Sequence, residues 1–184
     1  MKEKTIRSKT VFRGRLIRLD LVTIEIDGVR STREIVHHPG ATAVLAQLPD
    51  GRFVLVEQYR KPVEQELLEI VAGVLHAGER PDLCARRELK EETGYTARTL
   101  TKLAVLLPSP GYITEAIHLF YARLRPVQGR RNLDDDERVH VRYFTARQIE
   151  SLMKRGRIRD GKTLSAWALY NLTILRGKKR HSKP

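Results

Sequence analysis

The sequence has little cysteine and no long apolar run, and both features narrow its class. Cys84 is the single cysteine, so neither an internal disulfide nor a cysteine-rich zinc framework can form. No motif that would activate a thiolate surrounds it, so we interpret it as a small packed side chain rather than a nucleophile. No apolar run reaches the ~18 residues that span a bilayer, and no signal-peptide pattern opens the chain. We expect a soluble, cytoplasmic protein with no membrane partner.

Negative charge is also scarce, and the formal net charge is +13. Most of the excess lies at the two ends. Residues 1–18 contain seven Lys or Arg and one acid, and residues 176–184 contain five and none. The residues between these ends are nearly neutral, and no recognition helix or aromatic RNA-binding surface accompanies the charge. Nucleic acid is therefore not an expected partner, although basic ends predict weak, salt-sensitive attraction to polyanions.

The 184 residues, 41% of them hydrophobic, are enough for one core built from strands and helices. Asp27-Gly28 and Pro49-Asp50-Gly51 are typical of turns between antiparallel strands. We expect three parts: N-terminal β strands at 1–38, the main domain at 39–176 and a basic tail at 177–184. The patterns predict strands at 19–26, 32–36, 41–48, 53–58, 67–74, 103–107, 113–124 and 139–144, and helices from about 82 to 94, 146–155 and 162–175.

Three carboxylates share one face of the first expected helix. At 100° per residue, Glu88, Glu91 and Glu92 fall within an arc of about 100°. Glu88 and Glu92 form a like-charge pair one turn apart, which is destabilising unless a cation or solvent screens it. Arg87, four residues before Glu91, could hold that carboxylate. Spacing alone leaves two interpretations open, a site for a hard divalent cation and a solvated acidic face.

The segment around this helix resembles the Nudix box, GX5EX7REUXEEXGU, where U is aliphatic. Only the final position departs, because Tyr95 replaces an aliphatic residue. The resemblance implies a Nudix hydrolase with an α/β (α+β) fold: a mixed-sheet α/β/α sandwich, here with an N-terminal antiparallel β extension. It also implies that Arg87 and Glu79 are structural partners of the site. The matching residues are Gly73, Glu79, Arg87, Glu88, Leu89, Glu91, Glu92 and Gly94.

The resemblance implies a catalytic divalent cation, Mg²⁺ or Mn²⁺, bound at this helix. Glu88 and Glu92 correspond to the principal metal carboxylates of the family, and Glu91 to an additional ligand or a base. In the family's ADP-ribose branch, the carbonyl of the alanine before the first box glycine also binds metal, and that residue is Ala72. Neighbouring histidines do not enter this set, because Mg²⁺ prefers oxygen ligands.

Features outside the box resemble the ADP-ribose pyrophosphatase branch. A proline about sixteen residues after the last box glycine marks that branch, and counting from Gly94 reaches Pro110, which is followed by Gly111. The segments 57–63 and 161–163 are also similar to it. The resemblance implies hydrolysis of ADP-ribose to AMP and ribose 5-phosphate, with Pro110 and Gly111 at the substrate.

Two further groups of candidates are less well defined by the sequence. The branch uses a base from a loop, and the acidic segment 134–137 lies where that loop is expected, so Asp135 or Glu137 is the candidate; an exposed acidic turn is the alternative. Arg33 and Arg60 are candidates for substrate contact, because guanidinium groups bind phosphates and ribose hydroxyls in a bidentate manner. Taken singly, each is more often a surface arginine. The motif contexts Thr32-Arg33-Glu34 and Gln58-Tyr59-Arg60 give the two interpretations equal weight.

The sequence leaves the oligomeric state and other functions open. The resemblance implies a homodimer that exchanges N-terminal strands, and residues 10–36 have the size for that role. Val71 and Val74 depart from a pattern common near the first box glycine, which leaves GDP-mannose or another nucleotide sugar as an alternative substrate. A non-catalytic nucleotide-sugar sensor is the alternative of another class, and RNA decapping would use the positive charge. The complete box argues against a sensor, and Pro110 argues against decapping.

Overall fold

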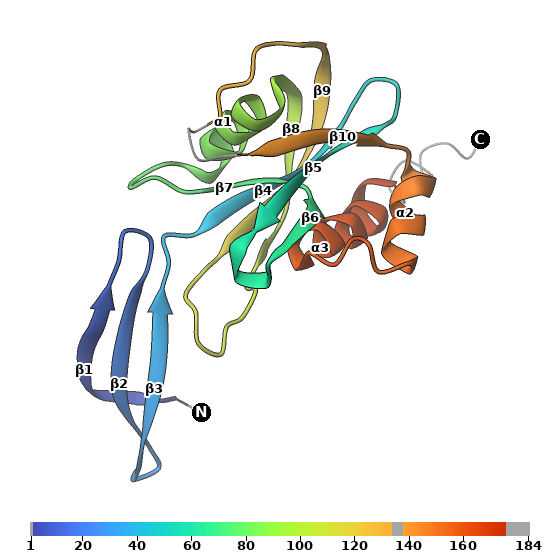
Figure 1. The fold of residues 1–184 in the computed structure, drawn as a ribbon. Coiled ribbons are helices and arrows are strands. Elements are labelled where there is room, and N and C mark those ends of the chain that lie inside the picture. Colours follow the sequence, from blue (N-terminus) through green and yellow to red (C-terminus); the bar gives the residue numbers. More distant parts are fainter. Residues whose placement is uncertain (1, 134–137, 176–184) are drawn as a thin grey trace. The chain divides into compact units, whose positions relative to one another are not determined.

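The computed structural model describes residues 2–133 and 138–175 (Figure 1). The described residues form two compact units. The smaller unit contains the chain up to Gly40 together with Leu107–Ala116, and the larger unit contains Ala41–Leu106 and the chain from Ile117 onward. None of the helices among these residues is both long and apolar enough to cross a bilayer.

The smaller unit is built on a three-stranded antiparallel sheet in the order β1-β2-β3. The strands are β1 (Lys4–Arg13), β2 (Arg18–Ile26) and β3 (Val29–His37). Asp27 and Gly28 both have positive φ, 49° and 81°, and form the predicted turn between β2 and β3. These strands confirm the predicted N-terminal antiparallel extension.

The segment Leu107–Ala116 joins the smaller unit through the end of β3. The Val36 N–H donates to the Tyr112 carbonyl at 2.8 Å, and the Thr114 N–H donates to the Val36 carbonyl at 2.9 Å. The His38 N–H adds a bond of 3.1 Å to the Thr114 hydroxyl. The strand that sequence patterns predict at 113–124 therefore begins four residues late, at Ile117, because residues 113–116 pair with β3 or form a loop instead.

The larger unit contains a seven-stranded mixed sheet with the main order β10-β5-β4-β9-β8. β6 pairs with β5 and β7 pairs with β4. Among the described residues of this sheet, β4 and β9 form the one parallel pair. The strands are β4 (Ala41–Gln47), β5 (Phe53–Arg60), β6 (Gln65–Glu69), β7 (Val71–Val74), β8 (Tyr95–Leu106), β9 (Ile117–Gln128) and β10 (Val139–Phe144).

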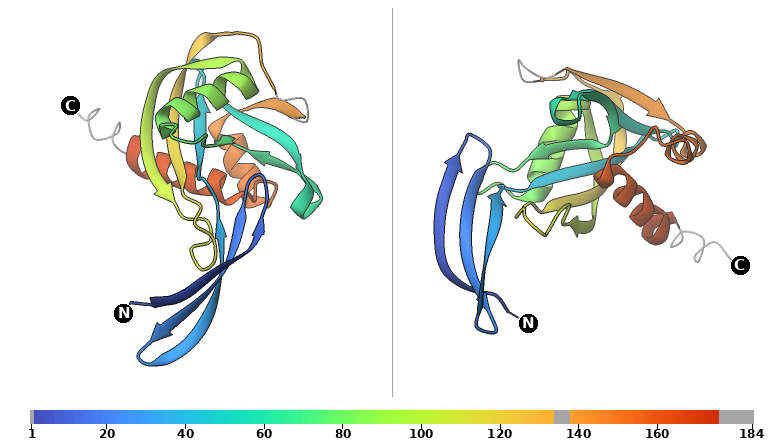
Figure 2. Two further views of the ribbon diagram at one scale, coloured as in Figure 1. Left: turned by 90° about the vertical axis from the view of Figure 1, so that its left-hand side faces the viewer. Right: turned by 60° about the horizontal axis from the view of Figure 1, so that its bottom comes forward.

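Helices cover both faces of this sheet (Figure 2). Successive side chains of a strand point to opposite faces, so β4 supplies Ala43 and Leu45 to one core and Val44 and Ala46 to the other. Trp167 of α3 (Gly161–Leu169) lies in the first core with Ile149 of α2 (Ala146–Lys154), while α1 (Pro81–Thr93) packs into the second. The result is the predicted α/β/α sandwich.

Other element boundaries also differ from the sequence prediction. The expected strand 67–74 is two strands with different partners, since Ile70 separates β6 from β7. β8 begins at Tyr95, well before 103. Its first half alternates buried Tyr95 and Ala97 with exposed Thr96 and Arg98, a weaker signal than the apolar run that predicted the strand at 103–107. α3 ends at Leu169, and the chain continues as a π-helix at Tyr170–Leu175.

The ends of α1 agree with the sequence signals and fix the position of its carboxylates. Pro81 occupies the first turn, where its missing N–H costs no helical hydrogen bond. Gly94 ends the helix with φ of 75°, and a Cβ at this position would lie 2.4 Å from the Gly129 carbonyl oxygen. Only glycine satisfies both the left-handed conformation and this close approach.

Candidate active site

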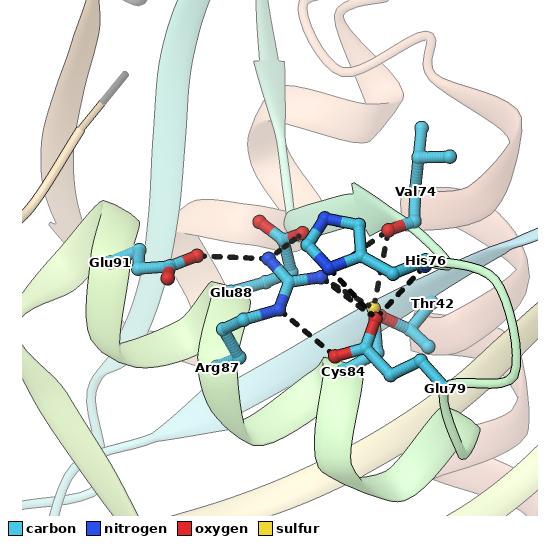
Figure 3. Close-up of polar contacts among 8 residues, drawn as sticks. All are labelled: Thr42, Val74, His76, Glu79, Cys84, Arg87, Glu88 and Glu91. Atoms are coloured by element: carbon cyan, nitrogen blue, oxygen red, sulfur yellow. Dashed lines mark hydrogen bonds and ion pairs between the residues drawn. The ribbon is translucent and has the colours of Figure 1, made fainter. Parts of the chain in front are cut away.

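The side chain of Arg87 gathers three carboxylates around one guanidinium group (Figure 3). Its Nε and Nη2 donate to the two oxygens of Glu79 at 2.9 and 3.0 Å. Its Nη1 donates to Glu88 Oε1 at 2.7 Å and to Glu91 Oε2 at 3.0 Å. The predicted contact between Arg87 and Glu91 is confirmed, and Arg87 also pairs with Glu79.

The same contacts fix the charge of the cluster. The Arg87 guanidinium, with further help from the His76 N–H, lowers the pKa of Glu79 to about 2, although burial opposes this. Glu79 in turn raises the pKa of Arg87. Both groups are therefore ionised at neutral pH, and Arg87 acts as a fixed counter-ion inside an otherwise acidic helix face.

Glu88 lies directly over Gly73 in the neighbouring strand β7. A Cβ built on Gly73 would lie 1.8 Å from the Glu88 carboxyl carbon and 2.0 Å from Oε1. No side chain larger than hydrogen fits beneath this carboxylate. The first glycine of the box is therefore required for the position of Glu88, and Ala72, the candidate carbonyl donor, is the residue just before it.

Glu92 lies one turn after Glu88 and is 3% exposed. Its negative charge acts on Arg60 of β5: the hydrogen bonds to Glu69 raise the pKa of Arg60 most, burial opposes them, and Glu92 adds to the increase. Arg60 and Glu92, both candidates from the sequence, therefore interact electrostatically although they belong to β5 and α1.

Arg60 has a partner that sequence patterns do not predict. Its Nε and Nη2 donate to the two oxygens of Glu69 at 2.9 and 2.7 Å, and Glu69 is 1% exposed. Lys162 contacts the same carboxylate at 2.5 Å. A charged residue inside the apolar run Leu67-Leu68-Glu69-Ile70 is the one sequence signal for this buried pair.

The remaining candidates lie elsewhere. Arg33 is on β3 in the smaller unit, where its Nη2 donates to Glu3 at 2.7 Å. Pro110 and Gly111 belong to the same unit, in the segment held against the end of β3. The two candidate loop bases, Asp135 and Glu137, lie outside the described residues, as does the basic tail.

Cys84 is a packed side chain, as predicted. It is completely buried, and its Sγ lies 3.5 Å from the Thr42 hydroxyl and 3.3 Å from Arg87 Nη2. Burial raises the pKa of the Cys84 thiol to about 11, which outweighs the opposite effects of Thr42 and Arg87. The thiol is neutral at physiological pH and does not provide a nucleophile.

The carboxylate oxygens of the box helix are the type of ligand that a hard divalent cation prefers. No group of three His, Cys, Asp or Glu side chains arranged to hold a metal occurs in residues 2–133 and 138–175. The box helix instead presents Glu88 and Glu92 one turn apart. Glu88 lies over Gly73 of β7, a position that has no side chain. Because Mg²⁺ usually takes one or two carboxylates and completes its shell with water and phosphate oxygens, this donor set fits it.

Comparison with known proteins decides the family. The Nudix domain family model matches residues 36–167, which is most of the chain. The chain belongs to the Nudix family.

Known proteins are similar to this Nudix chain over most of its length. It is 44% identical to an ADP-ribose pyrophosphatase of Bacillus subtilis over 95% of its residues and 94% of the relative. It is 34% identical to a GDP-mannose pyrophosphatase of Yersinia enterocolitica, over 85% of this chain and 86% of the other. The crystal structure of an ADP compounds hydrolase superposes with a TM-score of 0.84 at 27% identity, covering 98% and 97% of the two chains.

The close contact between Gly73 and Glu88 predicts how adding a methyl group at position 73 changes activity and stability. In Gly73→Ala, the new Cβ displaces the end of the flexible Glu88 side chain, so we expect kcat/KM to fall by about a hundredfold or more. The free energy of unfolding changes by less than about 1 kcal/mol, because a side-chain terminus moves rather than the backbone. Steady-state hydrolysis and urea denaturation measure the two effects.

Gly161→Ala is the matched control. Apart from its chain neighbours and its own helix, no atom of the described residues lies within 4 Å of a Cβ at Gly161, so the same substitution is expected to leave activity unchanged. Wild-type activity in Gly73→Ala would contradict the role given to the contact.

Proposed function

We propose that this Nudix hydrolase cleaves the diphosphate of ADP-ribose to release AMP and ribose 5-phosphate, with Mg²⁺ or Mn²⁺ as cofactor. The observation that carries the proposal is the helix face on which Glu88 and Glu92 lie one turn apart, beside the carboxylates gathered by Arg87. The substrate is supported by the 44% identical relative that bears this activity in its name.

The cation would be held by the carboxylates of Glu88 and Glu92 and by the carbonyl of Ala72. When bound, it would supply neutralisation of phosphate charge and a lowered pKa for a water molecule. The protein's own contribution is positional. Arg87 keeps Glu88 in place with one nitrogen, and Gly73 leaves the space that its carboxylate occupies.

Further residues are proposed for contact with the substrate. The charge of Glu92 contributes to the raised pKa of Arg60, so the Arg60 guanidinium lies near the proposed cation ligands. A guanidinium at this place suits contact with the diphosphate. Arg33, Pro110 and Gly111 are proposed for the substrate on the basis of the family resemblance. Glu91 is proposed as an additional ligand or base, and Asp135 or Glu137 as the loop base.

A second substrate has a specific observation in its favour. Relatives named GDP-mannose pyrophosphatase match most of this chain, although at lower identity than the ADP-ribose enzyme. Both substrates present a diphosphate between a nucleoside and a sugar, so the chemistry at α1 is common to them. Rates of AMP and GMP release under identical conditions separate the two proposals.

Glu92→Gln tests the proposed chemistry. The substitution conserves shape but removes the negative charge, so we expect hydrolysis of ADP-ribose to fall by about a hundredfold or more. The circular dichroism spectrum and the midpoint of urea unfolding are the measures of an intact fold. Undiminished hydrolysis in a folded Glu92→Gln protein would remove the assignment of this site.

We also propose a homodimer formed through the N-terminal sheet. β1 is exposed along its whole length, and it carries large apolar side chains, including Phe12, which is 52% exposed. Such exposed apolar groups suit an interface between copies. Sedimentation velocity of the full chain is expected to give twice the 21.2 kDa chain mass, whereas a fully active monomer would overturn the dimer.

A further inference from the structure

The buried carboxylate of Glu69 is shared by two cations from distant parts of the chain. Arg60 binds both of its oxygens, and Lys162 Nζ lies 2.5 Å from Oε2. Burial opposes ionisation of Glu69, but the contacts with Arg60 and Lys162 outweigh it and lower the pKa of this carboxyl. Glu69 is therefore a charged bridge between β5 and the start of α3.

The position of Lys162 is fixed from two sides. Its Nζ also contacts Asp160 at 2.9 Å, and Asp160 caps α3 by accepting from the Thr163 N–H at 2.9 Å. The Thr163 hydroxyl in turn accepts from the Ile70 N–H at 2.9 Å. The first turn of α3 is thus fastened to the backbone directly after Glu69, which leaves Lys162 little freedom to move.

This arrangement determines how Arg60 is presented. Its Nε and Nη2 are used by Glu69, and among the described residues no hydrogen bond engages Nη1. The Arg60 side chain is 39% exposed and lies within electrostatic reach of Glu92. Because the guanidinium is planar and rigid, holding one edge on Glu69 fixes the direction of the other.

We infer that Lys162 is a positioning residue, which holds Arg60 through Glu69 in the orientation needed to contact the substrate diphosphate. The inference rests on the proposed function and adds to it a residue of the last helix. Without the ammonium group, Glu69 and Asp160 are two carboxylates without their shared cation, and both attract Arg60. Arg60 then occupies several orientations, and the substrate binds less often in a productive one.

A double-mutant cycle tests this coupling. Lys162→Met and Arg60→Ala are made singly and together, and KM and kcat are measured for ADP-ribose, or for GDP-mannose if that is the better substrate. We expect each single substitution to raise KM by about tenfold, the effect of losing one charge-assisted contact. In the Arg60→Ala background, Lys162→Met adds little, because its effect passes through Arg60.

Controls separate positioning from a general loss of structure. Lys154→Met removes an exposed lysine from α2 and leaves KM unchanged, and Lys162→Arg restores most of the wild-type KM because it keeps the charge. If Lys162→Met does not fold, Lys162→Gln takes its place. Additive effects of Arg60 and Lys162, or an unchanged KM in the folded Lys162 variant, would overturn the inference.

A second readout does not depend on turnover. The Arg60 Nε–H proton, bonded to Glu69, should give a protected ¹H–¹⁵N resonance that is lost in Lys162→Met and kept in Lys154→Met. If the wild-type protein hydrolyses neither substrate, the proposed function fails, and the resonance still decides the coupling. A resonance that persists unchanged in Lys162→Met overturns the inference.

Discussion

The site depends on one guanidinium group that is shared by several carboxylates. Four acidic side chains, Glu79, Glu88, Glu91 and Glu92, come from a segment of 14 residues, and like charges at this spacing repel. Arg87 offsets that repulsion by binding three of them at 2.7 to 3.0 Å. The N–H donors of the Arg87 guanidinium lie in one plane, so they fix the orientation of each bound carboxylate as well as offsetting its charge.

A second network, on the neighbouring strands, also orders charged side chains around one shared group. Glu69 is the shared carboxylate there, and Arg60 and Lys162 are its cations. The sheet brings the two networks together, since β5 carries Arg60 while α1 packs against the same core as β5 and carries Glu92. One network orders the carboxylates proposed for a cation, and the other orders a cation proposed for the diphosphate.

Sequence reasoning predicted the parts of the site that are local in the chain. The face shared by Glu88, Glu91 and Glu92 follows from helical periodicity, whereas the sandwich was predicted from the resemblance of the helix segment to the Nudix box. It did not predict Glu69 and Lys162 as partners of Arg60, because 93 residues separate Glu69 from Lys162 and no periodic pattern relates them. Nor did it predict the early start of β8, because the alternation of buried Tyr95 and Ala97 with exposed Thr96 and Arg98 is short and less marked than the apolar run at 103–107.

Mn²⁺ binding tests most directly whether the helix face is divided as described, with Glu88 and Glu92 for the cation and Glu79 for Arg87. The dissociation constant is measured by electron paramagnetic resonance of free Mn²⁺ for wild type and for Glu88→Gln, Glu92→Gln and Glu79→Gln. We predict that the first two substitutions weaken binding at least about tenfold more than the third. Equal losses in all three variants, or a loss confined to Glu79→Gln, would contradict the account.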